Sequence, residues 1–168
     1  MIVEGRIHVF GDNVTTDEIM PTHKAAATAA ELAAYAMVGC DPDFPKKVKP
    51  GDVLVAGENF GAGSSRETAP LGLKGAGLGA IVAKSFARTF YRNCINQGLP
   101  ILVCPEAASA AKPGDVMRID LESGRVEVAG RTFQAEPFPP FLLTIIRHGG
   151  NVGYARAVLA ERARAAGA

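Results

Sequence analysis

Short apolar stretches alternate with polar or glycine-rich segments along the first two thirds of the chain. Residues Val3–Phe10 switch between apolar and polar side chains, which is typical of a strand. Val53–Ala56, Ala80–Ala83 and Leu99–Cys104 are almost entirely apolar and are bounded by turn residues. Such runs are typical of strands that are buried on both faces. The pattern therefore predicts four strands, three of them buried.

Segments of helical character separate these strands. Thr28 and Glu31 have the spacing of a capping box, which predicts a helix over Ala29–Val38. Two more helices are predicted over residues 65–73 and 87–97. Helices that alternate with buried strands are typical of βαβ units and of a parallel sheet.

The pattern changes after residue 113, where the apolar stretches become short and alternating. The elements predicted there are a hairpin, a further strand and two helices: Val116–Leu121 with Arg125–Val128, Gly130–Phe133, Phe141–Arg147 and Tyr154–Ala166. We therefore expect an α/β fold with a mainly parallel core and a β-hairpin region after residue 113. No segment resembles an interdomain linker, so residues 1–168 are expected to form a single domain.

Composition narrows the class of protein. The chain has 168 residues, 48% of them hydrophobic, and a formal net charge of +1. This balance gives no reason to expect nucleic acid or an anionic membrane as a partner. No apolar run approaches the ~20 residues that span a bilayer, and the N-terminus lacks the layout of a secretory signal. We expect a cytoplasmic protein.

The three cysteines, Cys40, Cys94 and Cys104, are widely spaced and form neither a C-x-x-C pair nor an obvious set of metal ligands. We expect three reduced thiols, and no metal bound by this chain. A metal cluster used by the protein would have to come from another polypeptide.

The segment that follows the second predicted strand carries the densest polar chemistry. Residues 57–67 read Gly-Glu-Asn-Phe-Gly-Ala-Gly-Ser-Ser-Arg-Glu. Glycine lets the backbone approach a ligand closely, and free N–H groups at the start of a helix favour an anion. Arg66 adds a planar guanidinium that fits a carboxylate with two hydrogen bonds. The segment therefore predicts a site that holds a small carboxylate beside the Ser64 hydroxyl.

A purely structural role for this segment is also open. Ser64 and Glu67 have capping-box spacing, so Ser64 could cap a helix that Glu67 caps in return. A cap, however, needs neither a second serine, nor Arg66, nor the preceding glycines. The two roles are compatible, since a helix N-terminus is where a carboxylate would bind.

Two nearby clusters are candidates for completing the site. Thr16 and Asp17 form either a plain turn or a group beside the glycine-rich loop that orients Arg66 or the substrate. His23 and Lys24 lie in the next loop, where they are either ordinary surface residues or contacts for a second carboxylate. A third cluster, in the helix predicted over 87–97, contains Asn93 and Asn96. Buried asparagines need partners, so we expect this helix to brace the loop rather than to catalyse.

Together these stretches resemble the swivel domain of the aconitase superfamily. The likeness is greatest to the separate small subunits of 3-isopropylmalate dehydratase and homoaconitase. It covers residues 1–150 and rests on several runs: Gly11–Asp17, Asp41–Phe44, Lys49–Asp52, Gly57–Glu67, Ala83–Arg88, Tyr91–Asn93 and Asn96–Pro100. The resemblance implies a swivelling β/β/α domain, with residues 151–168 as a helical tail.

The resemblance also implies a chemistry and a partner. Ser64 matches the family residue that takes a proton from carbon, while Ser65 and Arg66 match residues that hold a substrate carboxylate and stabilise the serine alkoxide. The family's large subunit carries a [4Fe–4S] cluster whose open iron acts as a Lewis acid on the substrate. The chain is thus expected to be a hydro-lyase subunit that binds no cofactor itself and is active only with the large subunit.

The implied substrate is a small 2-hydroxy dicarboxylate, foremost 3-isopropylmalate, which leucine biosynthesis interconverts with 2-isopropylmalate. Homoaconitate, 2,3-dimethylmalate and citramalate-like acids are alternatives, because residues 22–27 lack the Tyr-Leu-type segment that the isopropylmalate and homoaconitate enzymes often carry. A non-catalytic binding module of the same fold is a further alternative. We also expect that the isolated chain can form a homo-oligomer.

Overall fold

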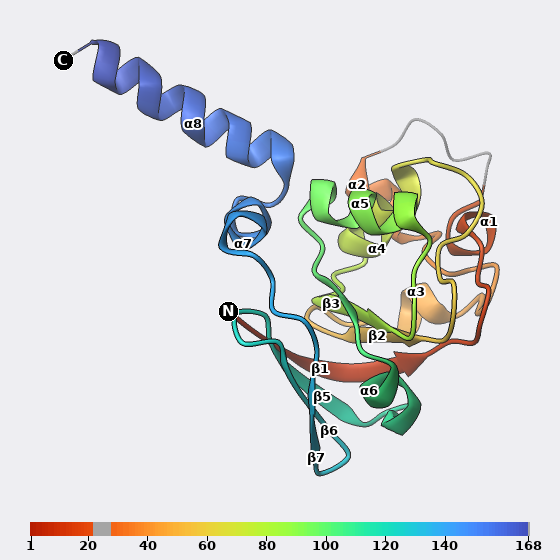
Figure 1. Cartoon of the computed structure of the whole chain (residues 1–168). Coiled ribbons are helices and arrows are strands. Elements are labelled where there is room, and N and C mark those ends of the chain that lie inside the picture. Colours follow the sequence, from red (N-terminus) through yellow and green to blue (C-terminus); the bar gives the residue numbers. More distant parts are fainter. Residues whose placement is uncertain (22–27, 168) are drawn as a thin grey trace.

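A single sheet of seven strands runs through the computed structural model, which describes residues 1–21 and 28–167 (Figure 1). Its strand order is β4-β3-β2-β1-β5-β6-β7. The strands are β1 Ile2–Val9, β2 Val53–Ala56, β3 Ala80–Ala83, β4 Ile101–Val103, β5 Val116–Asp120, β6 Arg125–Val128 and β7 Arg131–Gln134.

The sheet has a parallel half and an antiparallel half that meet at β1. On one side β1, β2, β3 and β4 are parallel, with Ile7 opposite Val53 and Val53 opposite Ala80. On the other side β5, β6 and β7 continue as an antiparallel meander. Every residue of β2 and β3 is buried, which explains why their sequences do not alternate. The predicted parallel core and the hairpin region after residue 113 are confirmed.

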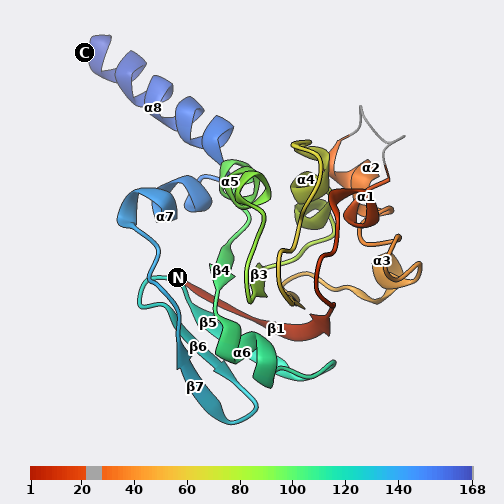
Figure 2. The same ribbon diagram turned by 45° about the vertical axis from the view of Figure 1, so that its right-hand side comes forward.

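Eight helices lie within the described residues: α1 Thr16–Ile19, α2 Ala29–Ala33, α3 Phe44–Lys47, α4 Thr68–Gly75, α5 Arg88–Gln97, α6 Pro105–Ala110, α7 Pro140–Arg147 and α8 Asn151–Ala166. In both views α2, α4 and α5 gather on the same side of the parallel strands (Figures 1 and 2). Fully buried Leu32, Leu73 and Phe90 belong to the core beneath them. The last helix, α8, extends away from the body and has no buried residue.

The helix predicted over Ala29–Val38 is shorter than expected. It ends at Ala33, and Met37 adopts a left-handed conformation with φ of 58°. The backbone N–H of Met37 donates to the carbonyl of Ile19, and that of Gly39 donates to the carbonyl of Glu18. The chain therefore leaves the helix because its N–H groups bond to the carbonyl groups at the end of α1 instead.

Candidate functional site

The glycine-rich segment connects β2 to α4 by a path that favours glycine at two points. Gly61 and Gly63 have φ of 81° and 110°. A Cβ atom on Gly61 would lie 2.2 Å from Cγ of Phe90, so the loop lies directly on this ring of α5. The N–H of Gly61 donates to the carbonyl of Val14 at 2.8 Å. The loop is thus held between α5 and the segment that precedes α1.

The same loop is bonded to α1 through Thr16. The N–H of Thr16 donates to the carbonyl of Ala62 at 2.8 Å, and the N–H of Ser64 donates to Thr16 Oγ1 at 3.0 Å. Thr16 is only 1% exposed. Of the two arrangements that the sequence allowed for Thr16 and Asp17, the structure has the one beside the glycine-rich loop. The buried Thr16 hydroxyl therefore holds the loop in place by accepting the hydrogen bond from the Ser64 N–H.

A capping box that the sequence analysis missed fixes the start of α1. The Glu18 carboxylate accepts hydrogen bonds from the N–H and the hydroxyl of Thr15 at 2.7 and 2.8 Å, and the Glu18 N–H donates to Thr15 Oγ1. The Thr15 backbone bond, followed by its hydroxyl, holds the pKa of the Glu18 carboxyl below its usual value. The Thr-x-x-Glu spacing was available in the sequence. This box holds Asp17 in the first turn.

Ser64 and Arg66 form the centre of the site. Ser64 is exposed, and its Oγ accepts hydrogen bonds from the backbone N–H of Arg66 at 3.3 Å and from Arg66 Nε at 3.1 Å. The capping box of Ser64 and Glu67, which the spacing left open, is not formed. Glu67 is itself the N-cap residue of α4 and makes no capping bond. The Ser64 N–H donates to Thr16 Oγ1 and the Ser64 Oγ accepts from Arg66, so neither is bonded to Glu67. Two donors of Arg66 therefore converge on the serine oxygen.

Asp17 completes this group by forming an ion pair with Arg66 Nη2. The Asp17 side chain is 64% exposed and that of Arg66 is 26% exposed, so the pair lies at the surface. The pair aligns the guanidinium across the Ser64 oxygen. Surface ion pairs add little stability, and we therefore attribute its importance to orientation.

Helix α5 braces the segment from the other side. The side-chain amide of Asn93 donates to the carbonyl of Ser65 at 2.9 Å, and Gln97 Nε2 donates to the Glu67 carboxylate at 3.2 Å. Asn93 is 9% exposed. Asn96 instead accepts from Asn151 of α8, so of the two asparagines only Asn93 makes the expected contact with the loop.

A second polar network holds the first residues of the loop. Asp12 Oδ1 accepts from the N–H of Glu58 at 2.7 Å, and the Glu58 carboxylate accepts from the Ser85 hydroxyl. The hydroxyl of Ser85 in turn accepts from the N–H of Asn59 at 2.8 Å. These side chains satisfy backbone groups of the loop, which is a structural role.

Some predicted site residues cannot be placed. His23 and Lys24 lie outside the described residues, so their contact with substrate stays a prediction. Within residues 1–21 and 28–167, no group of three histidine, cysteine or acidic residues could hold a metal ion. All three cysteines are free, and burial raises the pKa of the Cys94 and Cys104 thiols. The described part of the chain therefore offers no ligand set for an iron–sulfur cluster.

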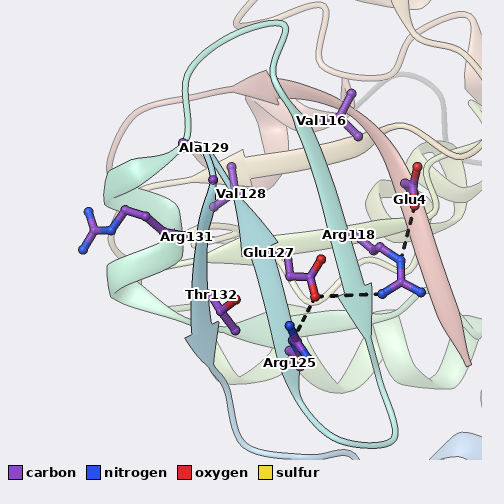
Figure 3. A pocket seen from close by; sticks show the side chains of 10 residues that line it. Glu4, Val116, Arg118, Arg125, Glu127, Val128, Ala129, Arg131 and Thr132 are labelled. Carbon is purple, nitrogen blue, oxygen red and sulfur yellow. Dashed lines mark ion pairs between the residues drawn. The ribbon is translucent and has the colours of Figure 1, made fainter.

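A charged hollow of about 400 Å³ lies on the antiparallel half of the sheet (Figure 3). Arg118 pairs with Glu4 at 3.4 Å, and Arg125 pairs with Glu127 at 2.8 Å. Glu4, Arg118 and Glu127 are opposite one another on β1, β5 and β6, so the charges neutralise each other across the strands. No described residue of the predicted site lines this hollow. It is best explained as the solvated face of the sheet.

In the part of the chain that the structure describes, no helix is both long and apolar enough to cross a membrane.

Comparison with known proteins identifies relatives over nearly the whole chain. The isopropylmalate/citramalate isomerase small subunit of Methanocaldococcus jannaschii is 47% identical over 163 residues, which cover 95% of this chain and 97% of that protein. The 2,3-dimethylmalate dehydratase small subunit of Eubacterium barkeri is 46% identical over 160 residues, covering 94% and 98%. A crystal structure of 3-isopropylmalate dehydratase from M. jannaschii matches with a TM-score of 0.90 and 42% identity, covering 98% and 99%.

The family follows from these findings. A family model described as the aconitase C-terminal domain matches residues 9–106. The chain belongs to the aconitase C-terminal domain family. The resemblance to the small subunits, predicted from the sequence, is confirmed. The names of these relatives as small subunits imply a heteromeric partner, the large subunit.

Proposed function

We propose that this chain is the small subunit of a heteromeric hydro-lyase that interconverts 3-isopropylmalate and 2-isopropylmalate in leucine biosynthesis. The observation that carries the proposal is the convergence of two Arg66 donors on the exposed Ser64 oxygen. The names of the full-length relatives point to the same chemistry.

Ser64 is the base in this proposal. A serine hydroxyl is a poor base near neutral pH, so its anion must be stabilised by nearby donors in a site that excludes water. The Arg66 guanidinium and backbone N–H are 3.1 and 3.3 Å from the oxygen. With the anion formed, Ser64 removes a proton from one substrate carbon while the hydroxyl group on the neighbouring carbon leaves as hydroxide, and a carbon–carbon double bond forms between the two. Water is then added with the positions exchanged: hydroxide bonds to the carbon that lost the proton, and Ser64 returns the proton to the carbon that lost the hydroxide.

The other site residues bind and orient. Arg66 and Ser65 hold a substrate carboxylate, and Asp17 keeps the guanidinium aligned until the substrate enters. Thr16 is buried and bonded to the Ser64 N–H, so we assign it to positioning the loop rather than to direct contact with the substrate. His23 and Lys24 are proposed to contact the second carboxylate.

The partner is proposed to supply the Lewis acid. We propose that the large subunit covers the exposed Ser64 and carries the [4Fe–4S] cluster, as the resemblance to the aconitase superfamily implies. When bound there, an iron ion of such a cluster acts as a Lewis acid. Three free cysteines fit a reducing compartment, and we propose that the complex is cytoplasmic.

A second substrate is favoured by a specific observation. A relative at 46% identity is named for 2,3-dimethylmalate, and another name includes citramalate. These acids and homoaconitate share the 2-hydroxy dicarboxylate group that Ser64 and Arg66 would recognise. They differ in the substituent, and we propose that residues 22–27 contact this substituent.

The test is a reconstitution with the large subunit and a panel of 2-hydroxy dicarboxylates. Turnover of 3-isopropylmalate with the highest kcat/KM is the expected result. A higher kcat/KM for dimethylmalate, citramalate or homoaconitate would leave the proposed chemistry of Ser64 and Arg66 standing, but it would identify a different substrate. Full activity of the large subunit alone would instead favour a non-catalytic binding module.

A further inference from the structure

The peptide unit between Ser65 and Arg66 links helix α5 to the catalytic oxygen. Its carbonyl accepts a hydrogen bond from Asn93 Nδ2 at 2.9 Å, and its N–H donates to Ser64 Oγ at 3.3 Å. The carbonyl and the N–H belong to one rigid plane and point in opposite directions. A donor that fixes the carbonyl therefore also fixes the direction of the N–H.

Asn93 is suited to fix the orientation of the Ser65–Arg66 peptide because its own side chain is buried in a packed helix. It is 9% exposed, and its neighbours Phe90 and Cys94 are 1% and 0% exposed. The ring of Phe90 packs against Gly61, and the side chain of Gln97 donates a hydrogen bond to Glu67. Together with Asn93, these residues form one face of α5 that contacts the loop at three points. The loop cannot turn its Ser65 carbonyl away without leaving a buried amide unpaired.

We propose that Asn93 is a positioning residue for the Ser64 alkoxide, acting through the Ser65–Arg66 peptide. The inference rests on the proposed function, and it adds a residue on α5 that does not touch the substrate. Donation to the carbonyl also polarises the peptide, which strengthens the hydrogen bond that its N–H makes. Asn93 therefore contributes most when Ser64 is an anion, which is when the substrate carbon loses its proton.

The experiment replaces Asn93 with aspartate in the complete complex. Asn93→Asp keeps the shape and removes the donor. Because the lost interaction is strongest in the transition state, kcat should fall by about tenfold or more while KM stays within about twofold. Asn96→Ala is the matched control on the same helix, since Asn96 contacts α8 instead, and it should keep the wild-type kcat.

The wild-type complex and the complex with Ser64→Ala are measured alongside Asn93→Asp. The comparison distinguishes failure of the proposed function from failure of the role proposed for Asn93. If the wild-type complex turns over none of the diacids, the proposed function fails. If wild type is active and Ser64→Ala is inactive, but Asn93→Asp keeps the wild-type kcat, the proposed function stands and the role of Asn93 is overturned. A rise in KM alone would also overturn it.

A measurement on the wild-type chain covers the case in which the variant does not fold. The side-chain amide protons of Asn93 and the backbone amide of Arg66 should both exchange slowly with solvent in NMR spectra. Exchange of both at the rate of an unstructured peptide would overturn the inference. Asn93→Leu, which keeps the volume and removes the polar group, should lose the protection at Arg66 and provides the second variant.

Discussion

Thr16 Oγ1 lies 3.0 Å from the backbone nitrogen of Ser64, although 48 positions separate the two residues in the sequence. The bond joins the start of α1 to the loop after β2, and it is made by a hydroxyl that is almost fully buried. The position of Ser64 therefore depends on the folded core and not only on its own loop.

The first prediction follows from this bond. Thr16→Val keeps the shape of the side chain and removes the acceptor, so the Ser64 N–H is left unpaired. We expect a loss of about 1 kcal/mol in the free energy of unfolding, measured with denaturant, and a lower kcat of the complex. Thr132→Val, at an exposed position of β7, is the control. Wild-type stability and kcat in Thr16→Val would contradict this role.

Arg66→Lys tests whether the shape of the guanidinium matters. Lysine keeps the charge but loses the Nε donor to Ser64 and the fork that binds a carboxylate. We expect kcat/KM of the complex to fall by about 10² or more, which is the effect of removing one donor from an oxyanion. Arg162→Lys, exposed on α8, should have no effect. If lysine supported wild-type turnover, charge alone would suffice and the proposed geometry would be refuted.

Gly61→Ala tests the close approach of the loop to α5. Its Cβ would lie 2.2 Å from Phe90 Cγ, and φ of 81° is unfavourable for alanine. We expect destabilisation by about 2 kcal/mol or more, measured as a shift in the denaturant midpoint. Gly11→Ala is the matched control because nothing lies within 4 Å of its Cβ, and it should change stability by less than about 0.5 kcal/mol. Equal stability of the two variants would contradict the packing described.

Asp52 provides a prediction about acid stability. Burial raises the pKa of its carboxyl, but hydrogen bonds from His8 Nε2 at 2.7 Å and from the Lys49 N–H outweigh this, so the pKa is lowered overall. A lowered pKa in the folded state stabilises the protein above the unfolded value of about 3.9, and this contribution is lost as the pH falls through the folded pKa.

The measurement is the free energy of unfolding as a function of pH. Asp52→Asn should be less stable than wild type near neutral pH, and the difference should shrink as the pH falls below about 4. Glu161→Gln, exposed on α8, should follow the wild-type curve. A constant difference between Asp52→Asn and wild type over the whole range would show that ionisation of Asp52 is not involved.

The sequence predicted the regular elements well where one physical rule dominated. The buried strands β2 and β3 were found at their correct bounds, because uninterrupted apolar runs have few alternatives. The hairpin of β5 and β6 was found from its turn residues. Two short helices, α3 and α6, were not predicted, and each begins at or beside a proline.

The residues of the candidate site were named from the sequence, whereas their contacts were not. The motif marked Ser64 and Arg66, whereas spacing alone suggested a capping box that Thr16 displaces. The bonds of Asp17 to Arg66 and of Asn93 to Ser65 span more than twenty residues, and no local pattern encodes them. That residues 1–168 form a single domain with a helical tail from 151 stays a prediction.

The central claim is that the Ser64 oxygen takes the proton from the substrate carbon. The most direct test is the rate of interconversion of 3-isopropylmalate and 2-isopropylmalate by the complex that contains Ser64→Ala, with the exposed Ser109→Ala of α6 as control. We predict that Ser64→Ala folds as wild type and still binds the large subunit, while turnover is lost and the control retains it. Wild-type turnover by Ser64→Ala would contradict the account.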